Sequence, residues 1–201
     1  MRALPAFTLL LASCGGGAAE NESEPEQNRA KPVVAPAAAL SPAAAPAPTS
    51  PLGKTVGCAP DEERIFSCKV ASGKRIAICG TGERDAEYRF GESTPELVLR
   101  GGRWASVPYS GGGEAQVAFA NGTTRYIVFS RMVRTNFAAG EPNNPAISDG
   151  VMVLDGEKVI GLQLCDDADT VSIDYDLAEA HFPRADELFS WETDRADRRT
   201  R

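Results

Sequence analysis

His181 is the only histidine of the 201-residue chain, so any Ser-His-Asp or Cys-His nucleophile would have to work through it. It lies beside Phe182 and Pro183 in a stretch without strand or helix periodicity. No serine stands in the Gly-x-Ser-x-Gly motif that exposes a catalytic serine. We therefore expect His181 to be a packed or exposed residue, and we predict a protein without catalytic residues that is not an enzyme.

Segment 166–176 holds five aspartates that could bind a hard cation such as calcium: Asp166, Asp167, Asp169, Asp174 and Asp176. An EF-hand loop needs glycine at its sixth and glutamate at its twelfth position, but counting from Asp167 these places hold Ser172 and Ala178. We expect a solvated acidic loop and predict neither a metal nor another cofactor. A cation-dependent hydrolase is the third alternative for the function.

The glycine-rich stretch 110–113 shares only its glycine content with a phosphate-binding loop, because it lacks the Lys-Ser/Thr ending and leads into a predicted strand. Trp104, Pro108 and Tyr109 precede it between predicted strands, where aromatic residues and glycines often make contacts. The possible binding loop consists of Trp104, Tyr109, Ser110 and Gly111. The alternative is that Trp104 only covers a sheet edge.

Short β-type runs cover most of the chain after residue 63. We predict strands at 64–70, 75–79, 87–91, 95–100, 117–120, 123–130, 151–154 and 158–164. Asn121-Gly122 and Asp155-Gly156 favour hairpin turns, and counting outward from the first turn places four residues on a core face: Val117, Phe119, Tyr126 and Val128. Residues 135–149, rich in Gly, Pro and Asn, should form a surface loop. The pattern predicts a mainly β fold, an antiparallel β-sandwich or small barrel.

Pro183 is placed to begin a short C-terminal helix, with Asp186 and Glu187 in its first turn and Leu188 and Trp191 on one face. The globular domain should therefore span residues 57–191. Residues 192–201 alternate in charge without an apolar face, so we expect a charged, flexible tail.

The chain has an even number of cysteines after residue 50: Cys58, Cys68, Cys79 and Cys165. If the domain is exported, as the N-terminal segment described next predicts, this number predicts two disulfides with three possible connectivities. A zinc site is disfavoured because no spacing is Cys-x-x-Cys. Matching the apolar alternation of strands 64–70 and 75–79 turns Cys68 inward and Cys79 outward, so these two should not pair. We favour Cys68 with Cys165 and Cys58 with Cys79, and the other pairings stay open.

Residues 1–14 have the layout of a secretory signal, with an apolar run too short for a bilayer, which needs about 20 residues. The run ends in Leu11-Ala12-Ser13-Cys14, a tetrad that resembles the lipobox of bacterial lipoproteins. The resemblance implies that Cys14 is acylated and anchors the mature chain in a membrane. Gly15 stands where an aspartate would favour inner-membrane retention, so the outer membrane is implied. An ordinary signal peptide with an incidental cysteine is the alternative.

Residues 15–56 form an Ala/Pro-rich linker with almost no aromatic or β-branched residues. Such a composition cannot bury enough apolar surface to offset chain entropy, so we expect a disordered tether that is partly polyproline II. The domain could then work well away from its membrane.

The chain carries 21 Lys and Arg against 28 Asp and Glu, a net charge of −7, and its basic residues are scattered. This argues against nucleic acid as a partner, because phosphate binding needs a concentrated basic surface. An acidic balance suits a cationic partner, although it also serves solubility.

Together these features predict a lipid-anchored protein of the cell envelope, whose domain lies in the periplasm or at the cell surface and is a non-catalytic binding module for an envelope protein. The chain also resembles bacterial periplasmic lysozyme inhibitors, which are exported, acidic, disulfide-bearing β domains. Their recognition loops carry a serine-glycine segment with a nearby tyrosine, and in Tyr109-Ser110-Gly111 the tyrosine precedes the serine. The resemblance implies a cationic, lysozyme-type hydrolase as partner. The alternative is a structural lipoprotein that docks on another envelope protein through its loops or sheet edge.

Overall fold

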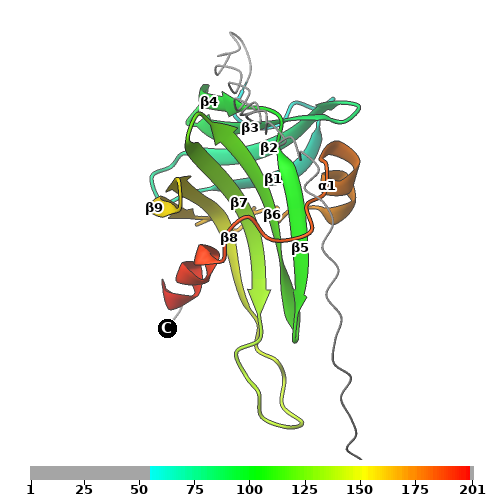
Figure 1. The fold of residues 1–201 in the computed structure, drawn as a ribbon, viewed down its shortest axis with the longest axis vertical. Coiled ribbons are helices and arrows are strands. Elements are labelled where there is room, and N and C mark those ends of the chain that lie inside the picture. Colours follow the sequence, from blue (N-terminus) through cyan, green and yellow to red (C-terminus); the bar gives the residue numbers. More distant parts are fainter. Residues whose placement is uncertain (1–54, 200–201) are drawn as a thin grey trace, which may run out of the picture. The chain divides into compact units, whose positions relative to one another are not determined.

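The computed structural model describes residues 55–199, which form two antiparallel sheets (Figure 1). The small sheet contains β1 (Glu63–Lys69), β2 (Arg75–Gly82), β3 (Asp85–Gly91) and β4 (Pro95–Leu99). The large sheet contains β5 (Arg103–Tyr109), β6 (Gly112–Asn121), β7 (Thr124–Val133), β8 (Ala146–Asp155) and β9 (Lys158–Leu164). In both sheets the strands lie in sequence order, and the described residues also form α1 (Tyr175–His181) and the 3₁₀ helix η1 (Glu192–Arg199).

The two sheets pack face to face around one main core. Tyr88 of the small sheet illustrates the packing, because its ring centroid lies 5.5 Å from Phe119 and 5.8 Å from Tyr126 of the large sheet. The predicted core face of β6 and β7 is confirmed, since Val117, Phe119 and Val128 are buried there and Tyr126 packs against them. The predicted mainly β fold is confirmed, and the two packed sheets fit its sandwich form.

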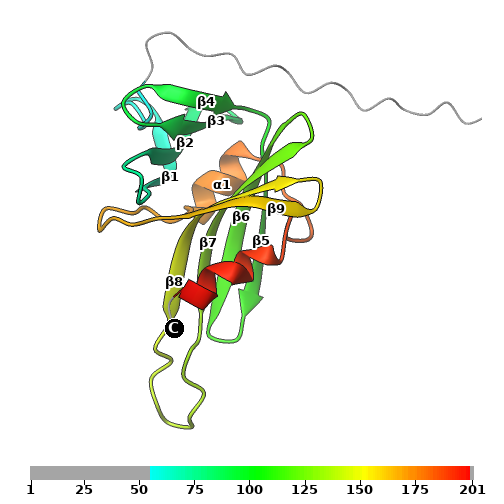
Figure 2. The ribbon, with the colours of Figure 1, turned by 90° about the vertical axis from the view of Figure 1, so that its left-hand side faces the viewer.

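The strands of the large sheet extend beyond the small sheet at one end (Figure 2). The β5–β6 turn and the loop 134–145 between β7 and β8 lie at that end, which we call the open end (Figures 1 and 2). At the open end the inner face of the large sheet is therefore not covered by the small sheet.

Both favoured disulfides are present. Cys68 joins Cys165 with Cα atoms 5.6 Å apart, and Cys58 joins Cys79 with Cα atoms 5.3 Å apart. The register is the reason, because Cys68 faces the core between the sheets whereas Cys79 faces outward, on the side of Glu87 and Arg89.

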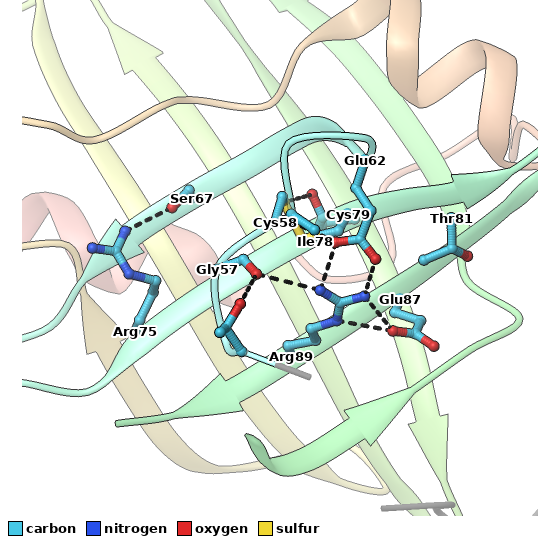
Figure 3. Close-up of a disulfide and its surroundings, with 12 residues drawn as sticks. Gly57, Cys58, Glu62, Ser67, Arg75, Ile78, Cys79, Thr81, Glu87 and Arg89 are labelled. Atoms are coloured by element: carbon cyan, nitrogen blue, oxygen red, sulfur yellow. Dashed lines mark hydrogen bonds and ion pairs between the residues drawn. A yellow bond between two sulfur atoms is a disulfide. The ribbon is translucent and has the colours of Figure 1, made fainter. Parts of the chain in front are cut away.

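The segment before β1 is held to the outer face of the small sheet by a buried arginine (Figure 3). Arg89 is 1% exposed and donates to both carboxylate oxygens of Glu62, at 2.7 and 2.6 Å. It also donates to Glu87, at 2.8 and 2.6 Å, and to the carbonyl of Gly57, at 3.3 Å. Burial acts to lower the pKa of Arg89, but the hydrogen bonds of Glu62 and Glu87 outweigh it and raise that pKa. Every N–H of the guanidinium has an acceptor. The segment around Cys58 is therefore held to the small sheet by these charged hydrogen bonds as well as by the Cys58–Cys79 disulfide.

Two strand predictions need correction. Residues 103–109, which we placed between strands, form β5, and β8 begins at Ala146 inside the predicted loop 135–149. Pro108 obscured β5, but it lies in an edge strand, where a missing N–H costs no ladder bond. The start of β8 reads as polar because Ser148 and Asp149 sit on it, yet it pairs with the end of β7.

The predicted short helix near the C-terminus is confirmed, but its predicted position, 183–191, is wrong. Segment 183–185 instead bridges to the edge of β5, with Trp104 N donating to Pro183 O at 3.1 Å and Ala185 N to Trp104 O at 2.7 Å. The helix lies earlier, in the acidic stretch, where Asp174 caps α1 by accepting from Leu177 N at 3.0 Å.

The expected flexible tail differs as well. Residues 192–199 form η1, which buries Thr193 and Ala196 against the outer face of the large sheet (Figure 1). Periodicity missed it because a 3₁₀ turn places its contacts differently from an α-helix.

The signal, the lipobox with Cys14 and the predicted tether as far as residue 54 lie outside the described residues. Between residues 55 and 199, no helix combines the length and apolar character needed to cross a membrane.

Candidate binding sites at the open end of the large sheet

Two buried polar side chains of β6 hold the C-terminal segment against the outer face of the large sheet. Gln116 Oε1 accepts from the backbone N–H groups of Phe189 and Ser190, at 2.9 and 3.2 Å, and its Nε2 donates to Ser190 O at 2.7 Å. Glu114 Oε1 accepts from Thr193 Oγ1 at 2.6 Å. Glu114 and Gln116 are fully buried, so losing these bonds would leave unsatisfied polar groups. The path of residues 189–193 is thereby fixed.

Arg131 of β7 completes this network. Its guanidinium donates to Glu114 Oε2 at 2.7 Å and to Asp197 Oδ2 at 2.9 Å, and lies 5.0 Å from the ring centroid of Tyr109. Burial acts to lower the pKa of Arg131, but the hydrogen bonds of Asp197 and Glu114 outweigh this effect and raise that pKa, so the guanidinium keeps its charge.

Tyr109 of β5 donates its hydroxyl to Glu114 Oε2 at 2.6 Å. Burial raises its pKa, and the hydrogen bond and charge of Glu114 raise it further, so the phenol stays neutral. Both carboxylate oxygens of Glu114 thus accept hydrogen bonds. The network has a structural role, and it forms a rigid surface that we call the floor of the groove described next.

Beside this floor lies a hollow of about 420 Å³, which we call the aromatic groove. Its lining includes Tyr109, Ser110, Arg134, Phe137, Trp191 and Asp194. Phe137 is 71% exposed and Trp191 is 61% exposed, although both are large aromatic residues. They come from different segments, the β7–β8 loop and the C-terminal segment.

The loop that carries Phe137 is tied at its base. Thr135 N and Asn136 N both donate to Asn143 O, at 3.1 and 3.0 Å, and the Arg134 guanidinium lies 5.1 Å from the Phe137 ring centroid. Gly111 forms the β5–β6 turn with a φ of 82°, where an added Cβ would meet the Asn143 side chain at 3.1 Å. The turn therefore packs against the loop, and the walls of the groove support each other.

A second hollow, about 300 Å³, lies on the inner face of the large sheet at the open end. We call it the Asp149 cleft, and its lining includes Ser130, Met132, Ile147, Asp149, Ser172 and Tyr175. Asp149 of β8 lies directly opposite Ser130 of β7 and is 8% exposed. Burial raises the pKa of Asp149 more than the hydrogen bonds of Ser130 and Ser172 lower it, and Oδ1 has no hydrogen-bond partner among the described residues.

The structure separates the residues of the predicted binding loop. Tyr109 and Ser110 line the aromatic groove, and Gly111 forms the neighbouring turn. Trp104 does not belong with them, because it is buried in the main core on β5, with the Arg184 guanidinium 4.7 Å from its ring. Its inclusion was wrong because residues 103–109 alternate between the two faces of a strand.

His181 is packed, as expected. Its Nε2 lies 2.5 Å from Glu63 Oε2 and against Gly80, where an added Cβ would approach the ring to 2.6 Å. The ring therefore joins the end of α1 to β1 and β2.

The aspartates after Cys165 accept hydrogen bonds that stabilise a turn and the start of α1. Asp167 accepts from Lys69 N at 3.0 Å and from Thr170 Oγ1 at 2.5 Å, and Asp174 caps α1. Within residues 55–199, the one group spaced for a metal is Cys58, Glu62 and Cys79. The two cysteines are joined in a disulfide and so offer no thiolate ligand.

Sequence reasoning missed Phe137 and Asp149 as site residues and placed Trp191 in a helix. Phe137 could have been found, because it is the one aromatic residue in the Gly/Pro/Asn-rich segment 135–149. Asp149 carried no signal, since its partner Ser130 is 19 positions earlier and is brought opposite only by the register.

Comparison with known proteins identifies no relative: no family model, curated protein or solved structure matches this chain.

Proposed function

We propose that this protein is an exported, membrane-tethered and non-catalytic binding module whose protein partner docks in the aromatic groove. The observation that carries the proposal is the exposure of Phe137 and Trp191 at one groove. Aromatic side chains are the residues that protein interfaces use most as anchors, and anchors act best when they are held rigidly. Here the Glu114 network and the tied loop hold them.

The chemistry of the partner follows from charge. A chain with a net charge of −7 attracts cationic proteins over a distance and speeds their encounter. Asp194 lies in the groove itself and can meet a basic side chain. The concrete form of the proposal is inhibition of a cationic, lysozyme-type cell-wall hydrolase.

The proposed location is the cell envelope, outside the cytoplasm. Two disulfides in a domain of this size are typical of an oxidising compartment. The lipobox-like Leu11-Ala12-Ser13-Cys14 supports an anchor through acylated Cys14, with the outer membrane as the proposed membrane.

Inhibition of lysis tests this form of the proposal. The full chain carrying Cys14→Ala, which removes the proposed lipidation, is mixed with a panel of cationic lysozymes and peptidoglycan. At least one enzyme should be slowed. Trp191→Ala and Phe137→Ala should each weaken that inhibition by roughly thirtyfold, the loss of about 2 kcal/mol typical of an interface anchor.

Ile160→Ala is the matched control, because Ile160 is also exposed but lies on β9, away from the groove. It should inhibit like the parent chain. If the parent has no effect at micromolar excess over every enzyme, the hydrolase-inhibitor form is wrong. If Ile160→Ala loses as much inhibition as Trp191→Ala, the groove is not the contact.

A second candidate is an assembly role through the edge of the large sheet. β9 is an edge strand with a 56% exposed Ile160, so its backbone can pair with a strand of another protein. A partner that contacts residue 160 instead of residue 191 would favour this role.

A further inference from the structure

The Asp149 cleft contains an acid without a matching base. Asp149 is 8% exposed, its Oδ1 has no hydrogen-bond partner, and it forms no ion pair within residues 55–199. Arg131 borders the cleft, but its guanidinium is bound to Glu114 and Asp197 on the outer face of the sheet. An unmatched buried carboxylate is costly, so a cation that reached it would be bound favourably.

The remaining walls suit a carbon chain. Met132, Ile147 and Tyr175 line the cleft and are all exposed to solvent. The Tyr175 ring is held edge-on against Trp104, with centroids 6.0 Å apart. A neighbouring hollow of about 460 Å³ shares Ile147, Asp149 and Ser172 with the cleft and continues it. Apolar walls around one acid are the surroundings that a long, singly charged side chain or amine needs.

The oxygen atoms at the floor favour an ammonium group over other cations. Calcium takes six to eight oxygen ligands, whereas the cleft offers one carboxyl and the hydroxyls of Ser130 and Ser172. A guanidinium prefers two free carboxylate oxygens, but the serine hydroxyls already bind this carboxyl and leave only Oδ1 without a partner. An ammonium is a point charge and needs a single acceptor to pair with.

Ser130 is oriented for this arrangement. Its Oγ accepts from Ile173 N at 2.8 Å, so its hydroxyl proton is free to donate to Asp149 opposite. Ser130 is therefore held in place before any ligand arrives.

We propose that the Asp149 cleft binds an alkylammonium group, with the nitrogen at the free oxygen of Asp149 and the carbon chain against Met132, Ile147 and Tyr175. The group belongs either to a lysine side chain of a protein or to a free amine. This site is separate from the aromatic groove, so it stands whether or not a partner docks there.

Titration with n-butylammonium, followed by calorimetry and by amide NMR shifts, tests the site in the full chain carrying Cys14→Ala. Saturable binding of about millimolar affinity is expected for so small a ligand. The shifts should centre on the backbone of Asp149, Ser130 and Ile173. Neutral n-butanol should bind at least about tenfold more weakly, because it lacks the charge.

Asp149→Asn should weaken n-butylammonium binding about tenfold or more, while Asp166→Asn, a change at an exposed aspartate, should leave it unchanged. If Asp149→Asn fails to fold, Met132→Lys is the second variant, since it supplies an ammonium from the wall of the cleft and should block the probe. Equal binding by the parent and Asp149→Asn would overturn the proposal. Binding that does not saturate would also overturn the proposal, because water alone would then be the hydrogen-bond partner of Asp149 Oδ1.

A capped lysine, Nα-acetyl-lysine N-methylamide, separates the two sources of the ammonium group. Binding as tight as that of n-butylammonium supports a protein lysine as the ligand. Binding of n-butylammonium without binding of the capped lysine supports a free amine.

Discussion

Removing the disulfides one at a time tests how each stabilises the fold. The first variant, Cys68→Ala with Cys165→Ala, opens a link across 97 sequence positions, and the second, Cys58→Ala with Cys79→Ala, opens one across 21 positions. A disulfide restricts the unfolded chain more when its loop is longer. The loop-entropy relation gives losses of about 4.7 and about 3.3 kcal/mol at 25 °C, a difference of about 1.4 kcal/mol.

The two variants are well matched in packing. Each removes one fully buried cysteine, Cys68 or Cys79, and one partly buried cysteine, Cys165 or Cys58. The cavity cost should therefore nearly cancel in the comparison. The difference in unfolding free energy between the two variants therefore measures the effect of loop length.

Guanidinium unfolding under oxidising conditions, with the free energy of unfolding extrapolated to water, measures both losses. The long-range variant should be less stable by about 1 kcal/mol or more. Equal losses, or a larger loss in the Cys58–Cys79 variant, would refute the loop-entropy reasoning. That result would mean that fixing the segment before β1 on the small sheet matters more than restricting the unfolded chain.

Three further changes have defined outcomes. Gly112→Ala should destabilise the fold by about 1–3 kcal/mol in chemical unfolding, since its Cβ would lie 2.0 Å from Met132 O. Gly82→Ala, with open space around it, should cost far less. Arg89→Met should cost about 3 kcal/mol, because the carboxylates of Glu62 and Glu87 lose the buried cation that they share, while Arg100 still pairs with Glu87, and a loss under 1 kcal/mol would contradict this. Asp149→Asn should gain stability relative to the parent as the pH rises above 3.8. The value 3.8 is the ordinary pKa of an aspartate, and burial raises the pKa of Asp149 in the folded protein above it. The protonated carboxyl therefore contributes its full share of the unfolding free energy below pH 3.8, and this share is lost as the pH rises through the folded pKa. A pH-independent difference in unfolding free energy would refute this.

The hairpins of this fold could be predicted because their signals are local. Asn121-Gly122 sets both the turn and the alternation that places Val117 and Phe119 inward. In strands 64–70 and 75–79, the alternation of apolar residues placed Cys68 and Cys79 on opposite faces and led to the observed disulfides. The alternation of apolar and polar residues along a strand involves only neighbouring positions, so it can be recognised in the sequence alone.

What could not be predicted depends on tertiary contacts. Residues 183–185 have helix-start residues, but they gain backbone hydrogen bonds from Trp104 on the edge of β5. Thr193 and Ala196 become buried only because the outer face of the large sheet offers Glu114 and Ile127. Propensity is overridden where such contacts exist.

The two candidate sites were predictable to different extents. Tyr109 and Ser110 were singled out because aromatic residues and glycines between predicted strands often make contacts, and both line the aromatic groove. Phe137 and Trp191 join them from segments that are far away in the sequence. Asp149 looks like a loop residue until the register places it opposite Ser130 in a cleft.

The central claim is that a protein partner docks in the aromatic groove, and site-specific photocrosslinking in the cells that make the protein tests it most directly. A photoreactive residue is placed at position 191, in the groove, or at position 160, on the edge strand β9. The account predicts crosslinks from position 191 to one cationic protein and none to it from position 160. Crosslinks from position 160 alone, or none from position 191, would contradict it.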